Sequence, residues 1–179
     1  MLVRVIAVIV VLLIAVPAAL YTWTRISPHE PRHEIEIDAR PALVWKVLTD
    51  LRAYPEWNPF IVSSEGEVRK GGKLVNKLVQ KGGGGSMTFK PTVLVAEPEK
   101  EYRWIGRFLV PGIVDGEHYF LLEALDGGER TRLVQGETFT GVVVPFAGGA
   151  IDVEEEFADM NRALKARAEK MAEAEKMAG

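Results

Sequence analysis

The sequence predicts an α+β fold in which a curved antiparallel sheet of six to seven strands wraps around a long C-terminal helix, behind one N-terminal transmembrane helix. Three observations lead to this expectation. An uncharged apolar run opens the chain, short segments in the middle alternate between apolar and polar residues, and the C-terminal part repeats apolar residues at helical spacing. A chain of 179 residues has room for one domain and an appendage.

Composition narrows the possible functions. The formal net charge of −3 gives no reason to expect nucleic-acid binding, and we expect no nucleic-acid partner. The chain has no cysteine, which excludes disulfides, thiolate catalysis and cysteine-ligated metal. Hydrophobic residues reach 47%, and their local excess lies at the start of the chain.

The N-terminal run is long enough to cross a membrane. From Val5 to Thr24 no residue is charged, which is about the 20 residues that a hydrocarbon core requires. Tyr21 and Trp23 sit at its end, where aromatic rings favour the interface. We expect a single-pass anchor that contacts the membrane through residues 2–24. The alternative is a cleaved signal peptide, which would release the domain as a secreted protein.

Membrane orientation follows from the flanking charges. Arg4 and the free amino group lie on one side of the apolar run, so we expect the N-terminus inside and the domain on the extracytoplasmic side. The predicted division of the chain is an anchor over residues 1–25, a proline-bearing linker over 26–31, and one domain over 32–179.

The domain begins with elements that the local sequence identifies. Alternation predicts a strand over His33–Asp38, and a helix follows over Ala39–Asp50, where Pro41 suits the first turn. The prolines of Leu51–Pro59 predict a short kinked helical segment. Six further strands are predicted over residues 60–69, 73–80, 87–96, 102–110, 117–125 and 131–140. Short connections between them indicate an antiparallel meander.

A glycine run over residues 81–85 predicts a hairpin turn without a function of its own. A phosphate-binding loop is the alternative, but no Lys-Ser/Thr follows and no helix begins there. The last predicted element is a helix over residues 150–177. Its apolar stripe consists of Ile151, Phe157, Met160, Leu164 and Ala168. Laid in the concave face of the sheet, such a helix often leaves a cavity.

Several motifs carry a resemblance to a known family. They are Ile37–Trp45 with Leu48-Thr49-Asp50, the segment Tyr54–Pro59, Gly116-Glu117-His118, Glu137–Gly141, and Phe157–Asn161 with Leu164-Lys165. On these residues the chain resembles the START-like (SRPBCC) superfamily with its helix-grip fold, in the polyketide cyclase/dehydrase and lipid-transport branch. The resemblance spans residues 32–169. It implies the fold, whereas superfamily members include lipid-transfer domains, quinone-binding proteins, aromatase/cyclases and chaperone ATPase activators.

Alternation along the later strands predicts which side chains face the interior. The expected ligand-binding residues are Trp57, Phe89, Trp104, Phe108, His118, Phe120, Gln135, Glu137, Phe139, Phe157 and Met160. The alternative for each aromatic residue is ordinary core packing. A buried carboxylate needs a partner, and His118 is the expected partner of Glu137.

Three functions remain open from the sequence. The first, which we favour, is a membrane-tethered domain that binds a lipid, quinone or polyketide-like molecule. The second is a cyclase/dehydratase-type enzyme in which His118 and Glu137 perform acid–base chemistry. The third is a protein-interaction module with a vestigial cavity, whose partner the sequence does not identify. We expect no metal site and no cofactor, and no G-x-S-x-G serine elbow is present.

Overall fold

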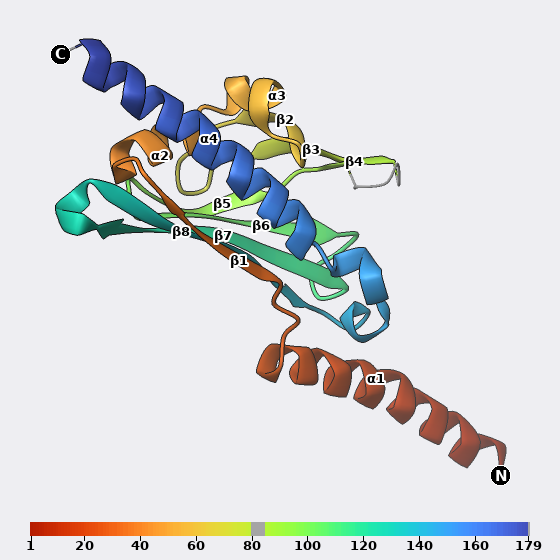
Figure 1. Cartoon of the computed structure of the whole chain (residues 1–179). Coiled ribbons are helices and arrows are strands. Elements are labelled where there is room, and N and C mark those ends of the chain that lie inside the picture. Colours follow the sequence, from red (N-terminus) through yellow and green to blue (C-terminus); the bar gives the residue numbers. More distant parts are fainter. Residues whose placement is uncertain (80–84, 179) are drawn as a thin grey trace.

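Two antiparallel sheets form the curved layer of the domain in the computed structural model, which describes residues 1–79 and 85–178 (Figure 1). The larger sheet has the strand order β1-β8-β7-β6-β5, and the smaller has the order β2-β3-β4. An isolated bridge between Lys73 and Thr92 connects them. The strands are β1 Arg32–Ile37, β2 Ile61–Gly66, β3 Leu74–Val79, β4 Ser86–Phe89, β5 Thr92–Glu97, β6 Glu101–Phe108, β7 Val114–Leu125 and β8 Arg130–Thr140.

One predicted strand is divided in the structure. The expected strand over residues 87–96 is wrong as a single element, because it splits into β4 and β5 in different sheets. Pro91 lies at the break, where its missing N–H cannot continue a ladder. Its carbonyl still accepts a hydrogen bond from the Leu74 amide at 3.0 Å. The split raises the number of strands above the expected six to seven.

The glycine run cannot be compared with its prediction, because residues 80–84 lie outside the described residues. The strands on either side pair antiparallel, from Val79 with Ser86 to Asn76 with Phe89. The helices that precede these strands lie close to the positions predicted from the sequence. They are α2 (Pro41–Thr49), the 3₁₀ turn η1 (Leu51–Ala53) and α3 (Tyr54–Trp57).

The C-terminal helix starts later than predicted. Two short 3₁₀ turns, η3 (Val144–Phe146) and η4 (Gly148–Ile151), precede α4 (Glu154–Ala178). Gly148 has a φ of 52°, which belongs to the left-handed region and interrupts a regular helix. Ile151 therefore lies in η4 and does not belong to the apolar stripe of the helix.

Helix α4 crosses the concave face of the sheet and closes the core (Figure 1). Its stripe of Phe157, Met160, Leu164 and Ala168 is fully buried. On the sheet, Phe120 and other inward side chains meet this stripe. Each large side chain buried in this way stabilises the fold by roughly 1.5–3 kcal/mol.

Helix α1 (Leu2–Ile26) lies outside this core (Figure 1). By length and composition it is able to cross a membrane, and a signal sequence near the N-terminus would meet the same criteria. Its last turn touches the domain: the Thr24 hydroxyl accepts a hydrogen bond from the Gly141 amide at 3.0 Å. The linker that follows is also attached, because His29 forms a β-bridge with Phe139.

Candidate functional site

Three polar side chains meet inside the apolar interior. Antiparallel pairing of β7 and β8 places His118 opposite Glu137 and Phe120 opposite Gln135. His118 Nδ1 lies 3.3 Å from Glu137 Oε2, and His118 Nε2 lies 3.2 Å from Gln135 Nε2. His118 and Gln135 are buried, whereas the Glu137 side chain keeps 19% of its surface exposed. The structure therefore brings together the polar residues that alternation assigned to one face.

The hydrogen bonds define the form of the imidazole. Gln135 donates its amide N–H to His118 Nε2, so that nitrogen is the acceptor. Nδ1 then carries the proton and donates it to the Glu137 carboxylate. Both ring nitrogens of His118 are consequently engaged within the protein.

Gly116 makes room for the carboxylate. A Cβ at this position would lie 2.2 Å from Glu137 Oε1 and 3.2 Å from the Phe139 ring. Only glycine allows Glu137 to lie across β7 and reach His118. The family motif Gly116-Glu117-His118 contains this residue, but its spatial role depends on strand register.

Aromatic rings enclose the histidine. The Trp104 indole stacks on the imidazole with centroids 4.5 Å apart, and the Phe157 ring meets its edge at 5.0 Å. Phe120 lies at 4.9 Å. Trp104, Phe120 and Phe157 belong to the core cluster. These three predicted residues surround the polar group directly.

Other residues that were predicted to bind the ligand lie outside this ring of aromatic contacts around His118. Trp57 stands edge-on to Tyr54, with centroids 5.2 Å apart. Phe89 packs beside Gly106, where a Cβ would lie 3.1 Å from its ring. Phe139 stacks on His29 of the linker.

The expectation that Phe108 faces the interior is wrong. Its side chain is 57% exposed. The residue is the last of β6, where the strand runs into an exposed connection that includes Leu109 and Val110, and there alternation no longer predicts burial. Met160, by contrast, is fully buried, and its sulfur accepts the second Gln135 amide hydrogen at 3.5 Å.

The interior is closed in this conformation. Gln135, Phe157 and Met160 each have 0% relative exposure. A void large enough for water beside these side chains would give them accessible surface, so they pack without one. Any ligand that reaches His118 must therefore displace or separate neighbouring groups.

Several interior polar atoms have no hydrogen-bond partner within the described part of the chain. They are Gln135 Oε1, Asn161 Oδ1, Tyr102 Oη, Trp57 Nε1 and Asn58 Nδ2. Burial raises the pKa of the Tyr102 phenol well above its usual range. Buried orphan groups of this kind are uncommon and point to a missing partner.

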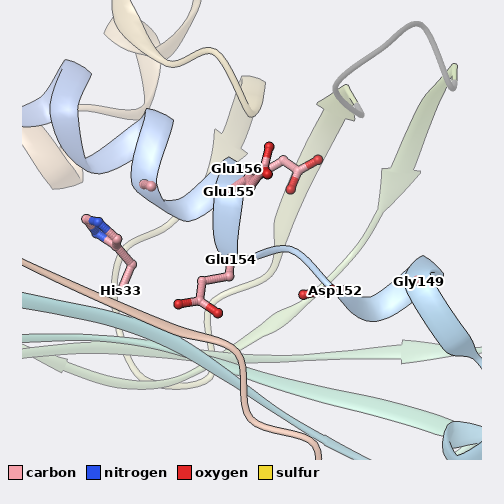
Figure 2. A pocket seen from close by; sticks show the side chains of 7 residues that line it. His33, Gly149, Asp152, Glu154, Glu155 and Glu156 are labelled. Carbon is pink, nitrogen blue, oxygen red and sulfur yellow. The ribbon is translucent and has the colours of Figure 1, made fainter.

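An open hollow adjoins this region at the start of α4. It has a volume of about 770 Å³ and is lined by His33 of β1, Gly149, Asp152 and the first turns of α4. Figure 2 shows His33 and Glu154 beside the hollow, with Glu155 and Glu156 directed away from His33.

His33 connects the hollow with the interior. It pairs with Gln135 across β1 and β8, so both side chains lie on the same face of the sheet. The His33 Nδ1 also lies 3.1 Å from the amide of buried Asn161. Asn161 follows Met160, which contacts Gln135. His33 and Asn161 were not predicted as site residues, because only the strand register and the position of Asn161 on α4 bring them together.

A second hollow of about 510 Å³ shares Gly149 and Asp152 with the first. Its walls come from the end of α1, the linker and the connection from β8 to α4, including Trp23, Pro28 and Val144. The two hollows thus form adjoining openings at the end of the domain that carries α1. Among residues 1–79 and 85–178, no cluster of three or more His, Asp or Glu side chains is arranged to hold a metal ion.

A curved antiparallel sheet that wraps around a long C-terminal helix is the arrangement of the START-like class of proteins. Within that class, the chain belongs to the polyketide cyclase / dehydrase and lipid transport family, whose model matches residues 28–169.

Solved structures show the same fold. The Zhui aromatase/cyclase from Streptomyces sp. R1128 is 18% identical with a TM-score of 0.65, and the match covers 81% of this chain and 96% of that one. A START superfamily protein from Mycobacterium smegmatis is 20% identical with a TM-score of 0.63, covering 80% and 99%. A comparison with curated proteins gave no match. At these identities the likeness shows the fold and not the activity.

Proposed function

We propose that this protein is a membrane-tethered domain that takes up an apolar small molecule, such as a lipid, quinone or polyketide-like compound, between the sheet and α4. His118, Gln135 and Glu137 orient the polar end of the molecule. The observation that carries this proposal is the buried polar group, in which Gln135 Oε1 has no partner among the described residues.

The arrangement suits a ligand that is apolar with one polar end. Small-molecule sites are mostly apolar with a few convergent polar groups that fix orientation. An unpaired buried acceptor is costly, and a ligand hydroxyl that donates to Gln135 Oε1 would remove that cost. Trp104, Phe120, Phe157 and Met160 supply the surrounding apolar surface. The predicted contacts at Trp57, Phe89 and Phe139 remain part of this proposal.

Uptake requires movement, because the interior is closed. The first turns of α4 are the element that separates the hollow from Met160 and Asn161. Gly148 and Gly149 immediately precede this helix, and nothing lies within 4 Å of a Cβ built on either residue. We infer that the start of α4 swings on this segment and opens the interior at the two hollows.

Binding fits the geometry better than catalysis. A general base must reach the proton it removes. Both nitrogens of His118 already have partners, and Trp104 covers one face of its ring. Glu137 retains partial exposure and is the group that a substrate could reach if the protein were a cyclase/dehydratase-type enzyme.

The closed interior favours a second candidate, which is a protein-interaction module with a vestigial cavity. In that case the aromatic residues are core only, and the domain recruits a partner to the membrane. The two functions differ in a direct measurement, because a vestigial cavity takes up no probe.

Titration of the full chain in detergent with a fluorescent fatty acid and a fluorescent quinone analogue tests the proposal. Gln135→Leu removes the orienting amide and should weaken binding by about tenfold, equivalent to 1.4 kcal/mol. Thr138→Val is the matched control, because Thr138 lies on β8 with the opposite facing and should leave affinity unchanged. Absence of saturable binding in the wild type would support the interaction module instead. Turnover of a polyketide substrate that Glu137→Gln abolishes would establish the enzyme.

A further inference from the structure

Two loops at one end of the domain expose an apolar patch. The loop patch consists of Phe108, Leu109, Val110, Val143 and Phe146, with exposures of 57%, 78%, 57%, 42% and 74%. The first three residues belong to the end of β6 and the connection to β7, and the other two to the connection from β8 to α4. A cluster of large apolar side chains facing solvent marks an interaction surface.

The patch adjoins the end of α1. A Cβ on Gly112, in the β6–β7 connection, would lie 3.6 Å from the Tyr21 ring. The Thr24 hydroxyl bonds the backbone of Gly141 where β8 ends. Figure 1 shows α1 passing beneath this end of the domain. Both loops are therefore fixed at the level of the last two turns of α1.

The length of α1 determines the depth at which the two loops lie relative to the membrane. Its 25 residues extend for about 38 Å at 1.5 Å per residue, against a hydrocarbon core of roughly 30 Å. An uncharged run that ends at Thr24 places Tyr21 and Thr24 at the boundary between hydrocarbon and head groups. The loops that touch these two residues must lie at the same boundary.

The charges agree with this placement. Residues 108–113 and 141–151 contain no charged side chain. The turns at the other end of the sheet carry Glu97, Glu99, Lys100, Asp126 and Glu129. The two loops therefore suit contact with lipid, whereas the acidic start of α4 beside them and the opposite end of the sheet suit water.

We propose that the loop patch inserts into the leaflet at the C-terminal end of α1, so that the domain rests on the bilayer through three contacts: α1 and both loops. The proposal rests on the membrane attachment included in the proposed function. The hollow of about 510 Å³, lined by Trp23, Val144 and Pro145, then opens at the lipid boundary. An apolar ligand reaches the interior from the bilayer without crossing water.

Single-cysteine labelling tests this placement, because the chain contains no cysteine of its own. Leu109→Cys and Phe146→Cys, labelled with an environment-sensitive NBD probe, report on the two loops of the full chain in phosphatidylcholine/phosphatidylglycerol vesicles. Glu129→Cys reports on the distant turn, and Val10→Cys reports on the middle of α1. Each variant is quenched with a doxyl-labelled lipid and, separately, with aqueous iodide.

We expect the probes at 109 and 146 to emit at shorter wavelength than the probe at 129, with several-fold more lipid quenching and several-fold less iodide quenching. If iodide quenches the probes at 109 and 146 as strongly as the probe at 129, while the probe at position 10 is embedded in lipid, the loops do not insert. That result would overturn the proposal but would agree with α1 as a membrane anchor. An aqueous position 10 would overturn the anchor as well. Protection from iodide without lipid quenching would place the patch against a second copy of the chain and likewise overturn the proposal.

Discussion

The imidazole of His118 lies parallel to the indole of Trp104, with centroids 4.5 Å apart and an interplanar angle of 2°. This stack fixes the plane of the histidine ring between two neighbouring strands. In that plane, one ring nitrogen reaches Glu137 and the other reaches Gln135. The aromatic contact thus positions the polar group from which the proposed binding follows.

Replacement of the imidazole by a hydrocarbon ring separates stacking from hydrogen bonding. His118→Phe keeps an aromatic ring beside Trp104 but removes the acceptor of one Gln135 amide hydrogen. We expect the free energy of unfolding to fall by about 2 kcal/mol, since an unsatisfied buried amide costs that much. Guanidinium unfolding of the full chain in detergent micelles measures the change. Unaltered stability would contradict the hydrogen-bonded arrangement.

Gly116 is predicted to control the Glu137 carboxylate. Gly116→Ala introduces a Cβ at 2.2 Å from Glu137 Oε1, so the carboxylate must leave His118 Nδ1. The ¹⁵N NMR signal of the His118 Nδ1–H should lose its hydrogen-bonded shift. Gly106→Ala is the control, because Gly106 pairs directly with Gly116 and its new Cβ approaches the Phe89 ring at 3.1 Å instead of the Glu137 carboxylate. An unchanged Nδ1–H signal in Gly116→Ala would contradict the assigned role.

Two buried tyrosines predict loss of stability at high pH. Burial raises the pKa of both Tyr54 and Tyr102, so the folded chain keeps these phenols protonated. The unfolded phenols ionise near pH 10, so stability is fully present below about pH 10 and falls as the pH rises further. Each tyrosine contributes about 1.4 kcal/mol per pH unit in that range.

Tyr102→Phe should therefore lessen the slope of stability above pH 10 by about 1.4 kcal/mol per pH unit. Since Tyr102 Oη has no partner in the described part of the chain, the substitution should not lower stability at pH 7. Chemical unfolding at pH 7, 10 and 11 measures both effects. An identical alkaline slope in wild type and variant would show that Tyr102 ionises freely in the folded state.

The joint between α1 and the domain depends on Thr24. Thr24→Val removes the acceptor of the Gly141 amide while preserving the size of a side chain that is only 3% exposed. Loss of one such hydrogen bond, at about 1 kcal/mol, should speed hydrogen exchange of the Gly141 amide by roughly fivefold to tenfold. Exchange at the Leu133 amide, in the middle of β8, should stay unchanged and is the internal control. Equal exchange rates at Gly141 would indicate that α1 does not dock there.

Much of the fold could be predicted because local pattern and tertiary structure agree. Alternation along β7 and β8 correctly placed His118, Gln135 and Glu137 on one face, and the stripe of α4 identified Phe157, Met160 and Leu164 as buried. In these elements, periodicity reports directly on burial.

The incorrect or missing predictions concern residues whose burial or contacts do not follow from the periodicity of the local sequence. Phe108 continues the alternation of β6 at the point where the strand ends in an exposed connection, and Ile151 continues the stripe of α4 before the helix begins. His33 was assigned only to the start of a strand, whereas its pairing with Gln135 makes it the connection between the hollow and the interior. The pairing of β1 with β8, which brings His33 beside Gln135, joins segments far apart in the chain and has no local signal in the sequence.

Native mass spectrometry of the full chain, released from detergent after purification from membranes, tests most directly whether the interior holds a ligand. The proposed function predicts one apolar small molecule bound per chain in the wild type and a clear loss of that species in Gln135→Leu, with Thr138→Val unaffected. A wild-type chain that is free of any bound molecule, and stays so after incubation with lipid and quinone mixtures, would contradict it.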